Sequence, residues 1–88
     1  MNVQYTPEAL AGLEALPASE PAIIRAVNDE LDLFEAEPGL TRWKRRGFGG
    51  VSPRTYGFDI HAPRGELLVL WQQTTASMIT VVYVGEPI

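Results

Sequence analysis

Residues 54–85 decide the fold, because apolar runs alternate there with short turn-like segments. In order, these runs and segments read RTYGFDI (54–60), HAPRG (61–65), ELLVLWQQ (66–73), TTAS (74–77) and MITVVYVG (78–85). Runs rich in β-branched, aromatic and leucine residues, bounded by turn residues, are typical of antiparallel strands. The stretch therefore predicts a three-stranded meander.

The turns and the middle run refine this prediction. In the first turn, Pro63 presets φ and Gly65 can adopt a positive φ, which predicts a tight hairpin with a bulge at the glycine. The second turn, residues 74–77, contains neither glycine nor proline. Residues 67–71 are apolar at every position, so we expect this strand in the middle of the sheet, covered at least partly on both faces.

Length and composition limit the class of protein. Eighty-eight residues suit a single domain, 1–88, with one modest core. The absence of cysteine excludes disulfides and thiolate metal sites and fits a reducing compartment. No apolar run approaches the roughly 20 residues that span a bilayer, and no signal-peptide pattern opens the chain. We therefore expect a soluble cytoplasmic protein with no membrane partner, no metal site and no cofactor.

Charge is distributed unevenly along the chain. The formal net charge is -4, and residues 1–41 contain eight acidic residues against one basic residue, Arg25. The basic residues that follow are Arg42, Lys44, Arg45, Arg46, Arg54 and Arg64. The global negative charge argues against non-specific nucleic-acid binding, whereas a local basic patch could hold one phosphate-rich site.

The N-terminal part predicts a short strand followed by a helix. Residues 2–5 alternate polar and apolar positions, which favours a brief strand. Thr6 and Pro7 then suit an N-cap and a first helical position, and the helix should end before Pro17.

A second helix start follows at Ser19, the expected N-cap, and Pro21. Apolar residues recur at helical spacing, namely Ile23, Ile24, Val27, Leu31 and Phe34. Pro38 should end this helix. We expect the two helices to be joined by about two residues and to form an antiparallel hairpin on one face of the sheet. The acidic residues between positions 29 and 37 are expected to form a solvated helix face.

Between this helix and the meander, residues 42–46 predict a short extended piece with Trp43 turned inward. Residues 47–53 are rich in glycine and predict a mobile loop. The fold class is therefore α+β with two layers: a short N-terminal strand and a helical hairpin packed on a C-terminal antiparallel sheet.

Several features together resemble a known family. They are the opening strand followed by TPEAL, the second helix closing at EPG, the basic WKRR segment and the final strand VVYVG. In this layout the chain resembles the RelE/ParE superfamily, the toxins of bacterial type II toxin–antitoxin modules. The resemblance covers nearly the whole chain and implies a partner, a small antitoxin protein.

The resemblance to the RelE branch implies a metal-independent endoribonuclease that cuts mRNA on the ribosome. In that chemistry the RNA 2′-hydroxyl attacks the adjacent phosphate, cations stabilise the phosphorane, and a side chain moves protons. The catalytic residues it implies in this chain are Arg45, Arg46, Arg54, His61 and Tyr83. The RNA-binding residues it implies are Arg42, Lys44 and Arg64.

Simpler readings and other functions stay open beside this one. The basic residues could be solvated charges, His61 an exposed strand-end residue and Tyr83 a packing residue. Where the middle strand of such toxins carries a tyrosine–arginine pair, this chain has Leu67 and Leu68. The alternatives are a ParE-like toxin that poisons DNA gyrase and a catalytically silent domain that only binds an antitoxin or itself.

Overall fold

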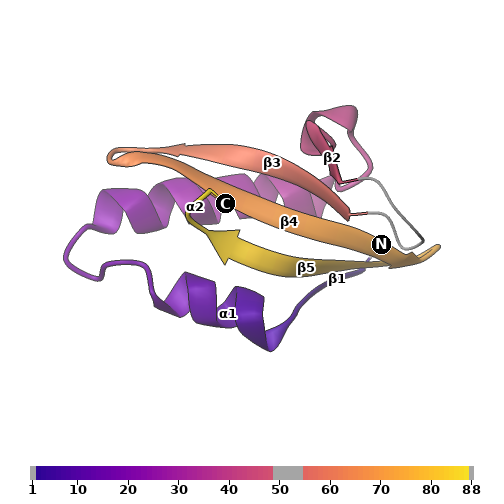
Figure 1. Ribbon diagram of the computed structural model, residues 1–88, viewed down its shortest axis with the longest axis horizontal. Coiled ribbons are helices and arrows are strands. Elements are labelled where there is room, and N and C mark those ends of the chain that lie inside the picture. Colours follow the sequence, from indigo (N-terminus) through magenta and orange to yellow (C-terminus); the bar gives the residue numbers. More distant parts are fainter. Residues whose placement is uncertain (1, 49–54, 88) are drawn as a thin grey trace.

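A mixed five-stranded sheet with two helices on one face forms the molecule (Figure 1). This computed structural model describes residues 2–48 and 55–87, and of Arg46 and Phe48 it describes the backbone alone. The elements are β1 (Asn2–Tyr5), α1 (Pro7–Glu14), α2 (Pro21–Ala36), the 3-10 turn η1 (Thr41–Trp43), β2 (Arg46–Phe48), β3 (Thr55–Ala62), β4 (Gly65–Thr75) and β5 (Met78–Gly85). The strand order is β1-β5-β4-β3-β2. The two-layer α+β class is thus confirmed.

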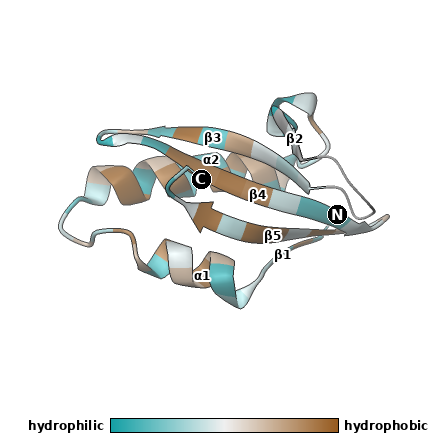
Figure 2. Ribbon diagram, in the orientation of Figure 1, coloured by the Kyte–Doolittle hydropathy of each residue, from teal (hydrophilic) through white to brown (hydrophobic). Residues whose placement is uncertain are grey.

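The meander is confirmed, with β4 as the central strand of the five. In one row across the sheet, Phe58 of β3 pairs with Val69 of β4, which pairs with Val84 of β5. All three side chains are buried against the helices, and hydrophobic colour runs along the middle of β4 and β5 (Figure 2). Leu68, one residue before Val69, is also buried, so both faces of β4 are covered at this point.

The first hairpin is tighter than expected. Ala62 pairs with Gly65, so Pro63 and Arg64 alone form the loop, and Gly65 adopts a φ of 129°. The β3–β4 register is regular up to the glycine, so the expected bulge there is wrong: Gly65 is itself the paired residue. Irregular pairing lies between β4 and β5 instead, after Leu70 and again after Gln73.

The N-terminal strand adds a parallel pairing to the sheet. β1 runs parallel to β5, with Val3 opposite Ile79, so the sheet is mixed and not purely antiparallel. The predicted cap is confirmed, because Thr6 Oγ1 accepts a hydrogen bond from the Ala9 amide at 3.2 Å. The same hydroxyl donates to the Val82 carbonyl at 3.3 Å, which fastens the start of α1 to β5.

Beyond β1, helix α1 continues along β5. A β-carbon on Gly12 would lie 1.9 Å from the Val84 carbonyl oxygen, so only a glycine permits this approach of helix to strand. α1 packs on β5, whereas α2 packs on β3. The two helices thus cover different halves of the sheet (Figure 1).

Helix α2 buries the predicted apolar stripe but begins differently. Ile23, Val27, Leu31 and Phe34 are all buried. The expected cap at Ser19 is wrong. Pro21 is the first residue of the helix, so Glu20 is the N-cap residue, and its side chain makes no capping hydrogen bond. The connection from α1 spans residues 15–20, longer than the expected two, since α1 already ends at residue 14. No helix in the described residues is long and apolar enough to cross a membrane.

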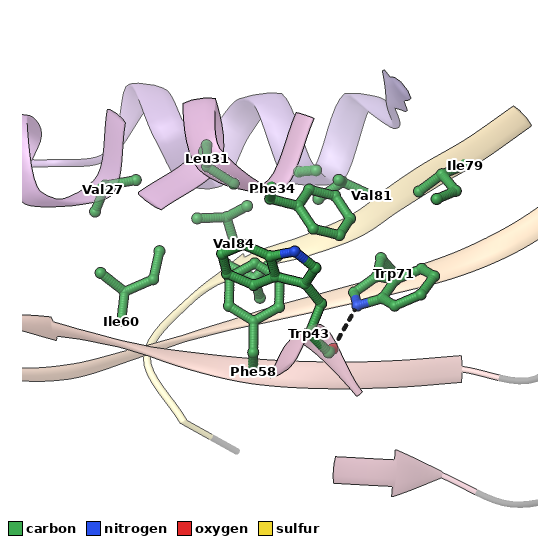
Figure 3. Packing of buried hydrophobic residues seen from close by; sticks show 12 residues of the cluster. Val27, Leu31, Phe34, Trp43, Phe58, Ile60, Trp71, Ile79, Val81 and Val84 are labelled. Atoms are coloured by element: carbon green, nitrogen blue, oxygen red, sulfur yellow. Dashed lines mark hydrogen bonds between the residues drawn. The ribbon is translucent and has the colours of Figure 1, made fainter. Parts of the chain in front are cut away.

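Four aromatic rings form the centre of the core (Figure 3). Phe34 lies within 5.5 Å, centroid to centroid, of Trp43, Phe58 and Trp71. The Trp71 indole Nε1 donates to the Trp43 carbonyl at 2.8 Å, and the Trp43 Nε1 donates to the Glu37 carbonyl at 2.9 Å. Each buried indole therefore has the polar partner that its N–H needs.

The segment before the meander corrects two expectations. Residues 41–43 form the turn η1 and not an extended piece, although Trp43 does point inward and is 2% exposed. Gly47 and Phe48 were expected in a loop. They belong instead to strand β2, which pairs with the first residues of β3. The rest of that expected loop, residues 49–53, lies outside the described residues.

The face of the sheet opposite the helices is partly covered by the end of the chain. After β5 the chain turns away from the helical layer (Figures 1 and 3). The Tyr83 hydroxyl donates to the Glu86 carbonyl at 2.5 Å, and the ring lies against Gly85. Gly85 pairs with Leu68, which is 1% exposed, so this corner of the open face is closed.

Candidate functional site

The basic segment, residues 42–46, leads from η1 into the edge strand β2. The Arg42 guanidinium lies 4.5 Å from the Trp43 ring centroid and 3.7 Å from a Glu30 carboxylate oxygen. The Lys44 ammonium lies 5.1 Å from the Tyr56 ring centroid. Both distances are within the range of cation–π attraction. The aromatic rings therefore support two of the cations while leaving them at the surface.

A cavity of about 400 Å³ lies between α2, the basic segment and β3. Its lining residues are Ala26, Asp29, Glu30, Arg42, Trp43, Arg45, Phe58, Asp59 and His61. β2 pairs with β3 only at residues 55–57, so the cavity opens where β3 continues past the end of its neighbour. The volume is in the range of small-ligand sites.

The cavity holds both signs of charge. Arg42 and Arg45 line it together with three acidic residues, Asp29, Glu30 and Asp59. Arg42 is already shared with Glu30. The cavity itself is therefore not a cationic cleft, and the cations most available to a phosphate are the outward-lying Lys44 and Arg45, both of which are exposed.

His61 lies on the same cavity as Arg45, as its proposed role requires. Its Nδ1 is 3.5 Å from a Glu66 carboxylate oxygen, and its side chain is 91% exposed. An imidazole beside a carboxylate is a suitable group for moving protons, provided that a substrate comes within hydrogen-bond reach. Full exposure is equally what a strand-end residue would show.

Arg64 is placed away from the basic segment. It sits in the β3–β4 loop, and its Nε is 2.6 Å from a Glu20 carboxylate oxygen. It lines a second cavity, of about 300 Å³, together with Glu66 and Glu86. Arg64 thus ties the hairpin tip to the start of α2, and the structure does not bring it together with Arg45.

Tyr83 is also separate from the cavity of Arg45 and His61, since it is not among that cavity's lining residues. It pairs with Leu70 on β4, and its hydroxyl proton is used in the bond to Glu86. This arrangement agrees with a packing residue that fixes the chain after β5.

Two candidates cannot be placed. Arg46 contributes its backbone to β2 opposite Gly57, and its side chain lies outside the described residues. Arg54 lies outside them altogether.

Sequence reasoning missed the acidic wall of the cavity. The sequence predicts Asp29 and Glu30 on a solvated helix face, yet both line the cavity, and so does Asp59. A signal for Asp59 existed, because an acid between Phe58 and Ile60 in a strand must face away from the core. In the described part of the chain, no three carboxylates or imidazoles are grouped so that they could hold a metal ion.

Comparison with known proteins shows a likeness of fold to a solved structure. No family model matches the chain, and no curated protein matches it. Among solved structures it is similar to a chain of the "archaeal RelE-RelB complex from Pyrococcus horikoshii OT3", with a TM-score of 0.61 and 15% sequence identity. The similarity covers 97% of this chain and 92% of that chain. The chain therefore has a RelE-like fold.

Proposed function

We propose that this chain is the toxin of a toxin–antitoxin pair and that a small antitoxin protein is its partner. The observation that carries the proposal is the fold likeness, which extends over 97% of the chain to a structure titled as a RelE–RelB complex. The acidic composition, the lack of cysteine and the small size agree with a cytoplasmic protein of this kind.

For its activity we propose cleavage of mRNA on the ribosome. The protein need supply no nucleophile, because the RNA 2′-hydroxyl attacks the neighbouring phosphate. What it must supply is positive charge for the phosphorane and a route for protons. Lys44 and Arg45 are exposed neighbours in sequence, and Arg45 shares a cavity with His61. These three residues are the best-placed group for that chemistry among the described residues.

A second candidate is a toxin or domain that binds protein and does not cut RNA. The observation favouring it is that two of the implied cations are occupied, Arg42 by Glu30 and Arg64 by Glu20. Poisoning of DNA gyrase and simple binding of an antitoxin both belong to this candidate.

The test is induction of the chain in bacterial cells, with growth recorded and mRNA 5′ ends mapped. Growth arrest with new ends inside codons supports the ribonuclease. Arrest with intact messages supports gyrase as target, and no arrest supports the silent domain. A gene beside this one that encodes a protein able to relieve the arrest is expected for the antitoxin.

One pair of substitutions makes the test specific to the basic segment. We expect Arg45→Ala to reduce cleavage by roughly a hundredfold to a thousandfold, the range found when one charge-stabilising donor is removed. Arg25→Ala is the matched control, since Arg25 is an exposed arginine of α2 outside the cavity. Equal cleavage by both variants would remove Arg45 from the proposed mechanism.

A further inference from the structure

Hydrogen bonds of the two tryptophans hold the start of the basic segment, at Trp43. Trp43 lies between Arg42 and Lys44 in the chain, and its ring is buried in the core. Its carbonyl accepts the Trp71 indole N–H at 2.8 Å (Figure 3), and its own indole N–H reaches back to the Glu37 carbonyl at 2.9 Å. Two hydrogen bonds therefore join the central strand, the basic segment and the end of α2.

These bonds are not needed merely to fill the core. The ring contacts among Phe34, Trp43, Phe58 and Trp71 would persist in any aromatic of the same shape. The indole N–H groups also orient the turn. A hydrogen bond is directional, so the two bonds fix how the turn that carries the cations is placed and rotated relative to the sheet. Arg42 and Lys44, on either side of Trp43, inherit that placement.

We propose that Trp71 and Trp43 are positioning residues, which set where Lys44 and Arg45 are presented to RNA. In this proposal each tryptophan acts through its hydrogen bond and not through contact with RNA. The inference rests on the proposed RNA-directed function, since it assigns a purpose to the placement of the same cations. Trp43, directly before Lys44, is held by its bonds to Trp71 and Glu37, and the β2–β3 pairing begins directly after Arg45.

The placement matters because binding of RNA by several cations depends on the distances between those cations. A phosphate contact from Lys44 or Arg45 gains most when its neighbour is already at the right distance, so that little ordering remains to be done on binding. We call the turn clamped when both indole hydrogen bonds are made. If only a fraction of the molecules is clamped, the apparent affinity for RNA is the affinity of the clamped state multiplied by that fraction.

The experiment removes the N–H groups and keeps the rings. The 88-residue chain is made by chemical synthesis with 3-benzothienylalanine at positions 43 and 71, in which sulfur replaces the indole N–H. Amide hydrogen exchange is measured first. The amides of Trp43 and Lys44, which bond within the turn to Leu40 and Thr41, should exchange faster by roughly two- to tenfold for each indole bond lost. Amides elsewhere that exchange by local opening, without breaking either indole bond, should keep their rates.

Binding of a fluorescein-labelled single-stranded RNA oligonucleotide is the second readout. We expect the dissociation constant to rise at least about twofold, which corresponds to half or less of the molecules remaining clamped. Val69→Ala is the control for a purely structural effect, because Val69 is fully buried and lies in the same core without bonding to the turn. It should lower the unfolding temperature while leaving RNA affinity unchanged.

The outcomes separate this inference from the proposed function. Unchanged exchange at Trp43 and Lys44 overturns the clamp. Faster exchange with unchanged RNA affinity overturns the positioning role, provided that Lys44→Ala with Arg45→Ala does weaken binding. If that double substitution leaves affinity unchanged, the RNA-directed function itself fails, and the exchange rates alone then decide whether the clamp exists.

Discussion

At the scale of single residues, Gly12 lies where helix α1 closely approaches strand β5. Its position leaves no room for a β-carbon, which would meet the Val84 carbonyl oxygen at 1.9 Å. By sequence alone, a glycine inside a helix pattern indicates only a local weakening of the helix. The reason could not be seen there, because Val84 is far along the chain and the contact exists only once α1 lies on β5.

We expect Gly12→Ala to destabilise the protein. In an exposed helix the change would stabilise by roughly 0.5–1 kcal/mol. Here the clash with Val84 should reverse the sign, at a net cost of about 1–3 kcal/mol. Urea unfolding followed by circular dichroism measures it. Gly39→Ala is the control, because nothing lies within 4 Å of a β-carbon there, and stabilisation by Gly12→Ala would show that the helix is not so close.

Tyr5 provides a pH-dependent test at the same scale. Burial first, and then the carboxylates of Glu35 and Asp32, raise the pKa of Tyr5 from 10 to about 12. The folded state thus disfavours the phenolate more than the unfolded state does. The contribution of the neutral phenol to stability is complete below pH 10 and is lost as the pH rises towards 12.

The expected result is a difference between two proteins. The free energy of unfolding of the natural chain, minus that of Tyr5→Phe, should stay constant below pH 10 and fall between pH 10 and 12. Phenylalanine cannot ionise, so changes shared by both proteins cancel. A difference that stays flat through this range would show that Tyr5 is as accessible when folded as when unfolded.

At the scale of elements, helix α2 separates a buried face from an exposed one within a few residues. Leu31 is 4% exposed, whereas Leu33 is 51% exposed. We expect Leu31→Ala to cost about 2–5 kcal/mol through the cavity it leaves. Leu33→Ala should stay within about 0.5 kcal/mol. Both changes alter helix propensity equally, so similar losses in urea unfolding would mean that α2 is rotated from its described position.

The elements also show how far sequence patterns reach. The three meander strands and the apolar stripe of α2 could be predicted, because their periodicity reflects which face is buried. Residues 42–48 could not, since a turn and a short edge strand have no period of their own. Trp43 was expected inside, yet its bonds to Trp71 and Glu37 join parts of the chain that no local pattern connects. The cavity likewise combines α2, the basic segment and β3.

At the scale of the whole molecule, the net charge of -4 and the exposed cations of the basic segment act in opposition. An acidic protein repels RNA at long range, so binding must depend on few, local phosphate contacts. Of the three described cations there, Arg42 is shared with Glu30, which leaves Lys44 and Arg45. The RNA association constant should therefore depend only weakly on salt concentration, as expected for two phosphate contacts.

We expect the logarithm of the RNA association constant to fall with the logarithm of salt concentration with a slope of about -1.4. This value corresponds to two single-strand phosphate contacts at about 0.7 each. Fluorescence anisotropy with a labelled oligonucleotide measures the slope. Arg45→Ala should bring it to about -0.7, because one contact is lost, and Arg25→Ala should leave it unchanged.

A steep slope in the natural chain would mean that many more cations take part, among them residues whose side chains lie outside the described part. A slope near zero would mean that the basic segment does not meet phosphate at all, and the protein-binding candidate would then explain the fold better.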